Sequence, residues 1–575
     1  MKKHSTILLL LFCQIALSQS INWVKNMEGL RNCEGYSIAL DASGNVYTTG
    51  YFDSIMDFDP GPSTYTLESH FGNEIYISKL NSNGGFVWAK AFGGLNGGGT
   101  GTSVKVDHMG NIILTGWFYG SVDFDPGVNN FTINAFYGDM FVLKLDNAGN
   151  FIWAKNMGGT YITQASSLAI DPLNNVLLTG HFNGTTDFDP GPNTYNLTEA
   201  NINGHGDSFI MKLDSVGNFM WAGRFGINEM SMSNCITTDN RGNVYTTGYY
   251  KGQLDFDPGV GTYILSSPSH NNSYVLKLNG NGQFLWAKQF GDSTNNCASN
   301  GIAVDNNNNI YTTGYFYGTK DFDPGAGTFT LTAPGTTDLF ISKLDSMGNF
   351  VWAKNTSASA DGMGHSIGLD NFNNLYIIGR YAGSSDIDSG PSTYIFSNIQ
   401  PGGQPLPGIF FLKVGFSGFV KSAIVVGPGW GEQGMAIAVD PSGNVHATGY
   451  FQGSNDTIDF DMGPATHTLS TTDRNNNFII KLKPMGTTVG VNDFLIHSVD
   501  ELKVYPNPNN GTFTIASVEN MRLTIINNLG QIIQSIELNE ANYFQQNITI
   551  NTSGVHYISG NTDKTAINQK IIVTK

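Results

Sequence analysis

Charged residues are scarce in this sequence, and positive charge is scarcer than negative. They make up 13% of the 575 positions, and 46 acidic against 29 basic side chains give a formal net charge of −17. A chain with this balance is poorly suited to the phosphates of nucleic acid or to an anionic membrane surface, so we expect no nucleic-acid partner. The low charge does not indicate disorder, because aromatic residues reach 12% and recur at regular intervals.

Long hydrophobic runs are absent after the first twenty residues. The chain opens with a basic segment at 1–4, an apolar run at 7–12 and small residues at 16–18. These are the three regions of a secretory signal peptide, which we predict over residues 1–18 with cleavage after Ser18. The bulky Phe12 before Cys13 argues against a lipid anchor on that cysteine. Since no later run could cross a bilayer, we expect no transmembrane segment in the mature chain.

The cysteine and histidine residues show no pattern that indicates a metal site or a full set of disulfides. Loss of the signal peptide leaves Cys33, Cys235 and Cys297, and an odd number leaves at least one thiol unpaired. A bridge between Cys235 and Cys297 is one alternative, and burial as small hydrophobic side chains is the one we favour. The histidines form no H-E-x-x-H motif or metal-ligand cluster, and His181 and His446 stand where other repeats have aromatic residues.

One pattern is repeated seven times along the chain. Each copy has a segment ending in glycine, usually followed by an aromatic residue, then an acidic D-F-D-P-G-type loop and a K-L segment. The marker glycines recur every 64 to 70 residues, at Gly50, Gly116, Gly180, Gly248, Gly314, Gly379 and Gly449. Short alternating apolar segments between Asn/Gly turns at this period are typical of β-propeller blades.

Tryptophan predicts how the ring closes. Five copies end on a W-A-K or W-A-G segment, at Trp88, Trp153, Trp221, Trp286 and Trp352, whereas the seventh ends at 478–482 without one. An unmatched Trp segment lies at 21–26. We expect it to complete the last blade and to leave no open sheet edge. The predicted fold class is all-β, with a propeller of seven four-stranded blades over residues 19–484.

Each blade is expected to present two different faces. In the first copy the predicted strands are 36–40, 46–52, 74–80 and 86–92. Tight Asx/Gly turns join the first strand to the second and the third to the fourth on one face. The other face carries the loop of about twenty residues with the D-F-D-P-G motif and the Gly-rich links between blades. Because long loops on a rigid scaffold usually carry function, we expect a ligand on this face.

Three motifs recur together over roughly residues 21–484: D-x-x-G-N-x-Y-x-T-G, D-F-D-P-G and G-N-F-x-W-A-K. In this respect the chain resembles the SBBP repeats of exported bacterial seven-bladed propeller proteins. The resemblance implies the fold. It leaves the activity open, because propellers serve as binding modules, lyases, hydrolases and scaffolds.

The acidic loops supply the candidate ligand-face residues. Both carboxylates of an extended D-x-D segment point to one side, so the pair could begin a calcium site. We favour a structural role, because a calcium cage needs about six or more oxygens and Pro-Gly forces a turn. The carboxylates would then cap backbone amides, and the Phe between them would pack between blades. Calcium aside, no cofactor is expected and no metal ligand is assigned. The candidates are Asp57, Asp59, Asp123, Asp125, Asp187, Asp189, Asp255, Asp257, Asp321, Asp323, Asp386, Asp388, Asp459 and Asp461.

Two other motifs also receive structural interpretations. An Asp before each first turn matches an Asx turn, in which its carboxylate accepts a backbone N–H two residues on. The segment 364–368, G-H-S-I-G, has the spacing of an esterase nucleophile elbow, but Ser366 lies in a predicted strand rather than in a strand-to-helix turn. We therefore assign no catalytic residue. The Asx-turn residues are Asp41, Asp107, Asp171, Asp239, Asp305, Asp370 and Asp440.

The end of the chain forms a separate unit. A polar, Gly-containing linker is predicted at 485–502, followed by short alternating strands that suit a small β-sandwich. The segment 503–575 resembles the C-terminal sorting domain of the bacterial type IX secretion system. The matching residues are Tyr505, Pro506, Asn507, Pro508, Gly511, Lys570 and Lys575. This resemblance implies a Bacteroidota source, the type IX machinery as partner, and a secreted or cell-surface protein.

The function we expect is binding. The leading hypothesis is a secreted or cell-surface binding or adhesion module for a glycan or an extracellular protein. The alternatives are a polysaccharide lyase or glycoside hydrolase that uses the paired carboxylates, and a structural surface protein. No copy of the repeat gains an isolated acid, base and nucleophile, which an asymmetric active site would require.

Overall fold

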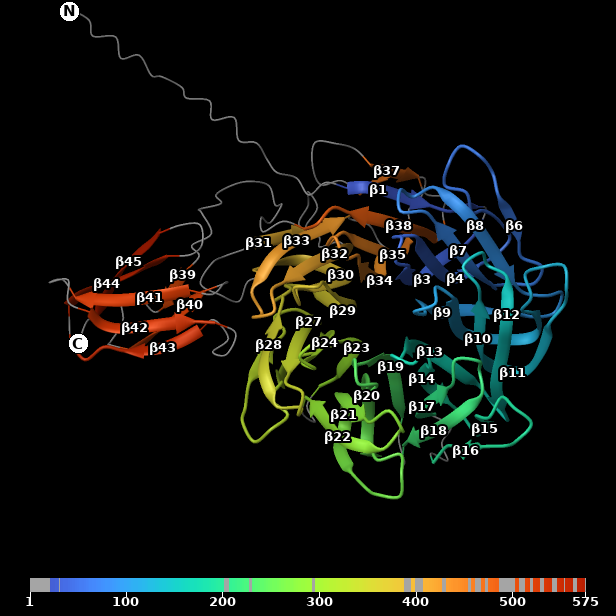
Figure 1. The fold of residues 1–575 in the computed structure, drawn as a ribbon, viewed down its shortest axis with the longest axis horizontal. Helices are drawn as coiled ribbons and strands as arrows, with labels where there is room; N and C mark the ends of the chain where they lie inside the picture. The colour runs from blue at the N-terminus through green and yellow to red at the C-terminus, as the bar shows by residue number, and fades with distance from the viewer. Residues whose placement is uncertain are drawn as a thin grey trace, which may run out of the picture.

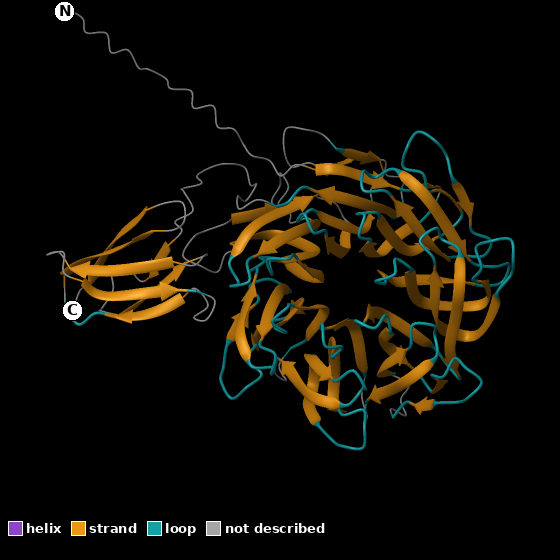
Figure 2. Cartoon of the chain, in the orientation of Figure 1, coloured by secondary structure: helices purple, strands orange, loops and turns teal. Residues whose placement is uncertain are grey.

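A computed structural model of the chain contains only β-strands as regular elements in the part that it describes (Figures 1 and 2). None of the described residues forms a helix that could cross a membrane. The predicted signal peptide and most of the predicted linker lie outside the described residues. These are 21–29, 31–200, 206–226, 230–291, 295–386, 395–398, 407–426, 431–452, 457–460, 467–470, 474–485, 502–505, 512–517, 521–527, 532–539, 545–552, 554–561 and 566–573.

Seven antiparallel sheets, each built on four main strands, surround a common centre (Figure 1). The first sheet consists of β3 (Cys33–Leu40), β4 (Val46–Phe52), β7 (Glu74–Leu80) and β8 (Phe86–Phe92). The second consists of β9 (Gly98–Val106), β10 (Ile112–Asp123), β11 (Thr132–Leu145) and β12 (Phe151–Gly159). The third consists of β13 (Thr163–Ile170), β14 (Val176–Phe182), β17 (Asp207–Leu213) and β18 (Phe219–Phe225).

The remaining sheets repeat this order of pairing. The fourth consists of β19 (Ser231–Thr238), β20 (Val244–Asp255), β21 (Ile264–Leu278) and β22 (Phe284–Phe290). The fifth consists of β23 (Cys297–Val304), β24 (Ile310–Phe316), β27 (Asp338–Leu344) and β28 (Phe350–Asn355). The sixth consists of β29 (Asp361–Leu369), β30 (Leu375–Asp386), β32 (Gly408–Val414) and β33 (Val420–Val426).

The seventh sheet joins the two ends of this region. Its strands β34 (Gln433–Val439), β35 (Val445–Phe451) and β38 (Asn476–Leu482) are completed by β1 (Ile21–Asn26). Trp23 lies opposite Lys481 and Asn26 opposite Phe478. The expected pairing of the N-terminal Trp strand with the last repeat is therefore present.

The long loops carry short strands that the sequence does not predict. In the first copy, β5 and β6 form a hairpin, and β5 also pairs with β2, the segment that follows β1. The second sheet is linked to the loop of the third in the same way, through β12 and β15. These hairpins therefore tie neighbouring sheets together. The short strands are β2 (Glu28–Gly29), β5 (Ile55–Asp57), β6 (Thr66–Glu68), β15 (Thr185–Asp187), β16 (Asn196–Thr198), β25 (Thr319–Asp321), β26 (Thr330–Thr332), β31 (Ile395–Asn398), β36 (Thr457–Asp459) and β37 (Thr468–Ser470).

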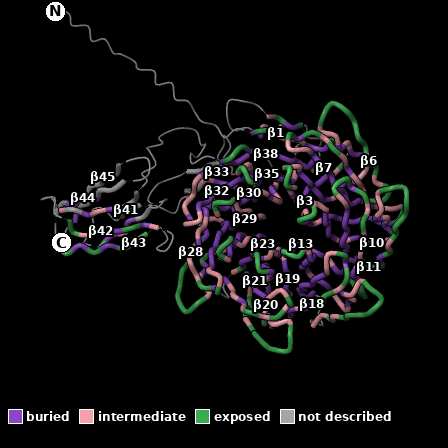
Figure 3. The backbone as a smooth tube through the Cα atoms, in the orientation of Figure 1, coloured by how far each residue is buried: buried purple, intermediate pink, exposed green. Residues whose placement is uncertain are grey.

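The core lies between neighbouring sheets. Successive residues of a strand point to opposite faces, and in the central strands both faces are buried. Ile112 of β10 packs in one cluster with Ile75 of the first sheet, whereas Ile113 packs with Val176 of the third. Figure 3 shows the burial along the strands and the exposure of the outer loops.

The three cysteines of the predicted mature chain are present as thiols. Cys33 and Cys297 are buried, Cys235 is half-buried, and no disulfide joins any two of them. The alternative of a bridge between Cys235 and Cys297 is therefore wrong in this structure. Burial as small side chains describes Cys33 and Cys297, each of which begins the innermost strand of its sheet.

The C-terminal strands form two further sheets. One contains β39 (Leu502–Tyr505), β40 (Thr512–Ser517) and β43 (Gln545–Thr549). The other contains β42 (Ile532–Leu538), β41 (Met521–Asn527), β44 (Gly554–Asn561) and β45 (Ala566–Val573). Phe513 and Ile548 from the first share an apolar cluster with Leu523 and Ile558 from the second, so the two sheets pack face to face.

Candidate functional site

The paired carboxylates of the acidic loops accept hydrogen bonds from their own backbone. Asp57 Oδ1 accepts the N–H of Asp59 at 3.0 Å and that of Tyr65 at 2.9 Å. Asp59 Oδ1 accepts the N–H of Gly61 at 2.8 Å, which caps the Pro-Gly turn. These are Asx contacts, so one carboxylate closes the hairpin and the other closes its tip.

The same contacts recur in the other copies. The first Asp accepts the N–H two residues on and the N–H eight residues on, at Asp123, Asp187, Asp255 and Asp321. The second Asp accepts the glycine N–H, at Asp125, Asp189, Asp257 and Asp323. In the seventh copy Asp459 Oδ1 accepts the N–H of His467 at 2.9 Å. Asp386 ends β30, while Asp388 and Asp461 lie outside the described residues.

The phenylalanine between the two acids is a core residue. Phe58, Phe124, Phe188, Phe256, Phe322 and Phe460 are all buried. Phe124 of the second copy lies 6.2 Å from Phe92 of the first sheet, with the rings nearly parallel. Each loop is thus anchored by an aromatic ring. Within the described residues, no group of three or more His, Cys, Asp or Glu side chains is arranged to hold a metal ion.

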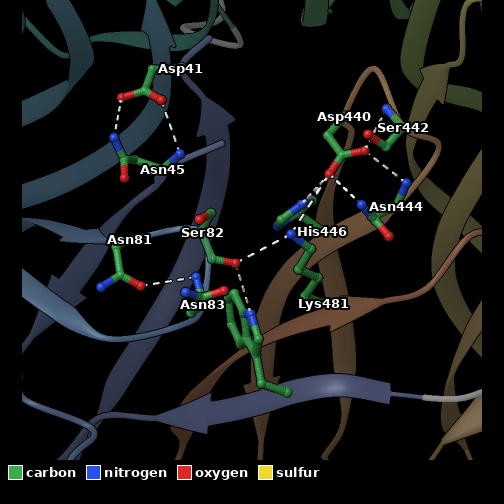
Figure 4. Close-up of polar contacts among 11 residues, drawn as sticks. Asp41, Asn45, Asn81, Ser82, Asn83, Asp440, Ser442, Asn444, His446 and Lys481 are labelled. Atoms are coloured by element: carbon green, nitrogen blue, oxygen red, sulfur yellow. Dashed lines mark hydrogen bonds and ion pairs between the residues drawn. The ribbon is translucent and has the colours of Figure 1, made fainter. Parts of the chain in front are cut away.

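The aspartate of each first turn also accepts hydrogen bonds from nearby residues of its own sheet. Asp41 Oδ1 accepts the N–H groups of Ser43 and Asn45, and its Oδ2 accepts Asn45 Nδ2 at 2.7 Å and the Tyr47 hydroxyl at 3.0 Å. Figure 4 shows the contacts of Asp41 with Asn45. Burial alone would raise the pKa of Asp41, but these hydrogen bonds outweigh it and hold the pKa below its ordinary value. The predicted Asx turn is present in all seven copies, at Asp41, Asp107, Asp171, Asp239, Asp305, Asp370 and Asp440.

A lysine on the third strand of each sheet reaches the next sheet, a contact that was not predicted from the sequence. Lys144 Nζ lies 2.9 Å from Asp107 Oδ2 in its own sheet and donates to the Ser215 carbonyl of the third sheet at 3.1 Å. Each equivalent lysine donates to a backbone carbonyl at 2.8 to 3.4 Å. The carbonyl lies in a turn in six copies, and the acceptor of Lys413 is Met485, which follows β38. The recurrence of K-L before an Asp or Asn turn in five of the seven copies was the available signal. The lysines are Lys79, Lys144, Lys212, Lys277, Lys343, Lys413 and Lys481.

The tryptophans pack under the same turns. Trp88 Nε1 donates to the Asn147 carbonyl at 3.4 Å, and its ring lies beneath Gly149. A Cβ on Gly149 would lie 3.1 Å from the Trp88 ring, and the positive φ of 81° also favours glycine. Every sheet that ends in Trp therefore places its indole against a glycine of the following sheet, at Gly84, Gly149, Gly217, Gly282, Gly348 and Gly418.

The first and seventh sheets meet through this arrangement, as Figure 4 shows. Lys481 Nζ and Trp23 Nε1 both donate to the Ser82 carbonyl at 3.3 Å. His446 stands where four of the other copies have tyrosine, and its Nε2 lies 3.4 Å from Asp440 Oδ2. Burial, reinforced by the nearby Lys481 ammonium, lowers the pKa of His446 to about 4.

The G-H-S-I-G segment lies within one strand, whose pairing with β30 has an irregularity between Gly364 and Ser366. Ser366 lies within β29, and His365 Nδ1 lies 2.9 Å from the Gly434 carbonyl of the seventh sheet. His181 is largely enclosed, and burial lowers its pKa. His365 and His181 both occupy positions of the repeat where side chains pack in the interior. No nucleophile elbow is formed, because the required helix does not follow the serine.

The sorting motif is only partly within the described residues. Tyr505 is the last residue of β39, and Lys570 lies in β45. Pro506, Asn507, Pro508, Gly511 and Lys575 lie outside the described residues.

Comparison with known proteins identifies two segments. Residues 503–574 match the family model described as the secretion system C-terminal sorting domain, and residues 285–315 match the beta-propeller repeat named SBBP. The second segment contains β22 and the start of the fifth sheet, so it spans the junction between two sheets.

Relatives of known sequence share part of their length with this chain. An uncharacterised WD repeat-containing protein, L264, of Acanthamoeba polyphaga mimivirus is 25% identical over 486 residues, covering 71% of this chain and 34% of the viral protein. The regulatory protein FlaEY of Caulobacter vibrioides is 23% identical over 165 residues, or 28% of this chain and 16% of FlaEY. The chain thus spans 34% of the first relative's length and 16% of the second's.

The structure of Sqt1 from Chaetomium thermophilum is 9% identical, covers 81% of this chain and 100% of its own, and has a TM-score of 0.34. This likeness is too low to bear on the fold or the function. The two family matches carry the identification, together with the strand pairing: this is an all-β chain that contains an SBBP β-propeller repeat and ends in a secretion-system C-terminal sorting domain.

Proposed function

We propose that the seven sheets are the blades of a closed β-propeller that acts outside the cell as a binding or adhesion module for a glycan or an extracellular protein. The sorting domain supports export by the type IX secretion system and a secreted or cell-surface location. The pairing of β1 with β38 supports closure, because it leaves the last sheet with four strands like the others.

One observation carries the choice of binding over catalysis. Wherever the structure describes both carboxylates of an acidic loop, they accept backbone N–H groups at 2.8 to 3.1 Å. A glycoside hydrolase needs one carboxyl as acid and one as base or nucleophile, both facing the sugar. Carboxylates that hold the same turn in every copy do not supply that asymmetry.

The test is whether the protein binds a glycan or an extracellular protein without cleaving the glycan that it binds. The purified full-length protein is expected to bind components of a glycan and extracellular-protein array, and to release no reducing ends or unsaturated products from the glycans that it binds. Release of product at a rate that depends on an acidic-loop carboxylate would instead support the lyase or hydrolase alternative. Absence of binding to any component would contradict the proposed function.

A further inference from the structure

Three exposed aromatic rings gather on the long-loop face of the second sheet. Phe136 is 91% exposed, Tyr137 58% and Tyr161 59%. The Phe136 and Tyr137 ring centroids are 5.6 Å apart, and those of Tyr137 and Tyr161 are 5.9 Å apart. These residues, here the aromatic cluster, form a continuous apolar surface in contact with solvent, and such surfaces usually mark an interaction site.

Two neighbouring sheets position the rings of the aromatic cluster. In the second sheet β10 and β11 continue past an irregularity at Phe118/Gly120 and stay paired as far as Asp123 and Thr132. This longer ladder carries Phe136 and Tyr137. Tyr161 follows β12, and its ring packs on Gly184 of the third sheet, where a Cβ would lie 2.6 Å from Tyr161 Cδ2. Backbone pairing on the second sheet and a glycine on the third therefore position the rings.

The repeat itself does not require these rings. The fourth sheet has the same extended ladder, with Gly252 opposite Ser267 where the second sheet has Gly120 opposite Ala135. The next two residues are Pro268 and Ser269 in the fourth sheet, but Phe136 and Tyr137 in the second. The aromatic ring that does recur is a different one: Phe131 contacts Phe151 at 4.9 Å, as Tyr263 contacts Phe284.

The groups beside the aromatic cluster are mostly polar and uncharged. Asn134 and Ser121 hydrogen-bond to each other on the same hairpin, and the Thr160 hydroxyl accepts the Thr185 N–H at 3.0 Å. The neighbouring charge is acidic, because Glu199 accepts the N–H of Gly184. A negative group here and a net charge of −17 disfavour polyanions, whether acidic polysaccharide or nucleic acid.

We propose that the aromatic cluster is a binding subsite for an uncharged polysaccharide. This inference rests on the proposed binding function and adds to it the site and the ligand class. The C–H face of a pyranose ring stacks on Phe136, Tyr137 and Tyr161, while its hydroxyls reach the tyrosine hydroxyls, Asn134 and Thr160. Aromatic rings with polar tips suit a ligand that has one apolar face and a wet edge.

The experiment is native affinity electrophoresis of the full-length protein. The gels contain uncharged polysaccharides (laminarin, xyloglucan, galactomannan or amylopectin) or anionic ones (alginate or polygalacturonate). Retardation is expected in at least one uncharged gel. The double variant Phe136→Ala/Tyr137→Ala, and separately Tyr161→Ala, should weaken that binding by about tenfold or more. Phe372→Ala is the matched control, because Phe372 is 79% exposed in a first-turn loop of the sixth sheet, on the opposite face.

The outcomes separate this inference from the broader function. Binding that survives both sets of variants, or retardation by the anionic polymers alone, would overturn the glycan subsite and leave a binding module intact. Failure to bind any of the four uncharged polymers, with binding to an extracellular protein, would overturn the ligand class and support a protein partner. Thermal melting of each variant confirms that it is folded, so that lost binding reports on the surface.

Discussion

At the scale of single residues, carboxylates in this protein bind mainly the backbone around them. Asp57 and Asp59 close a loop, and Asp41 closes a first turn. The sequence predicts the Asx turn because Asp before x-x-G/N-N has one well-known local use. The ion pair that the Oδ2 atom of this aspartate forms with a lysine could not be predicted in the same way. In the second, third and seventh sheets the lysine comes from a strand that is distant in the sequence.

Calcium removal is the first residue-scale prediction. Chelation with EDTA is expected to leave the melting temperature of the full-length protein unchanged, because the acidic-loop carboxylates are occupied by N–H donors. Asp57→Ala should lower the melting temperature equally with and without added calcium. A fall of many degrees on chelation, absent in the Asp57→Ala variant, would show that this loop holds a metal ion.

The second prediction concerns pH and His446. Its pKa is about 4 in the folded chain and about 6.5 when unfolded, so the unfolded chain binds more protons between these values. Stability should therefore fall as the pH drops from about 6.5 towards 4, by up to about 3 kcal/mol from this group.

The variant His446→Tyr introduces the residue that four of the other copies have and should remove that part of the pH dependence. Urea unfolding at a series of pH values measures it. His108→Tyr, at an exposed turn, serves as control. Equal pH profiles for the wild type and His446→Tyr would contradict the assignment.

At the scale of elements, the turn between the third and fourth strands is the joint between sheets. It receives a lysine and, in most copies, an indole from the preceding sheet. The sequence predicts the turn from Asn, Asp and Gly, but the turn's partners lie 59 to 73 residues away in the chain or, for Lys481 and Ser82, 399 residues away. Only the arrangement in space could identify them.

Substitution of the glycine in that turn tests the contact between neighbouring sheets. Gly282 and Gly242 belong to the fourth sheet and have φ of 80° and 79°, but a Cβ on Gly282 would lie 2.8 Å from the Trp221 ring, whereas one on Gly242 meets nothing within 4 Å. Gly282→Ala should destabilise the protein by about 1–3 kcal/mol more than Gly242→Ala, since both strain the backbone and only one displaces the indole. Equal losses in chemical denaturation would show that the indole contact adds nothing.

Removal of the N-terminal strand tests closure. Deletion of residues 21–27 exposes an edge of β38 and removes three buried apolar side chains, Ile21, Trp23 and Met27, so several kcal/mol should be lost. If the deletion variant does not fold, Trp23→Ala carries the test, with Asn22→Ala at an exposed position of β1 as control. A deletion variant that melts at the wild-type temperature would rule out a closing role for β1.

At the scale of the whole molecule, the regular features followed from the sequence and the irregular ones did not. A seven-copy period, an unmatched Trp strand and a C-terminal motif predicted the all-β class, the pairing of β1 with β38 and the sorting domain. The three-residue strands of the loops were missed because alternation needs a longer run to be visible. The aromatic cluster was missed because its rings come from β11 and from the link after β12, and only the arrangement in space brings Tyr137 and Tyr161 together.

The seven-sheet region and the C-terminal strands are expected to fold and act independently. Among the described residues, strands β39–β45 pair only with one another and have their own apolar cluster, while the seven sheets are paired without them. The predicted linker lies between. We therefore expect the seven-sheet region to fold and bind without the sorting domain.

The most direct test of an exported binding module is deletion of residues 503–575 in the native host, followed by cell fractionation and thermal melting. The shortened protein should remain in the periplasm, melt as a folded protein and keep its ligand binding, whereas the full chain reaches the cell surface or the medium. Export of the shortened protein at the normal level would contradict the role of the sorting domain. Loss of its fold would show instead that residues 503–575 are a structural partner of the seven sheets.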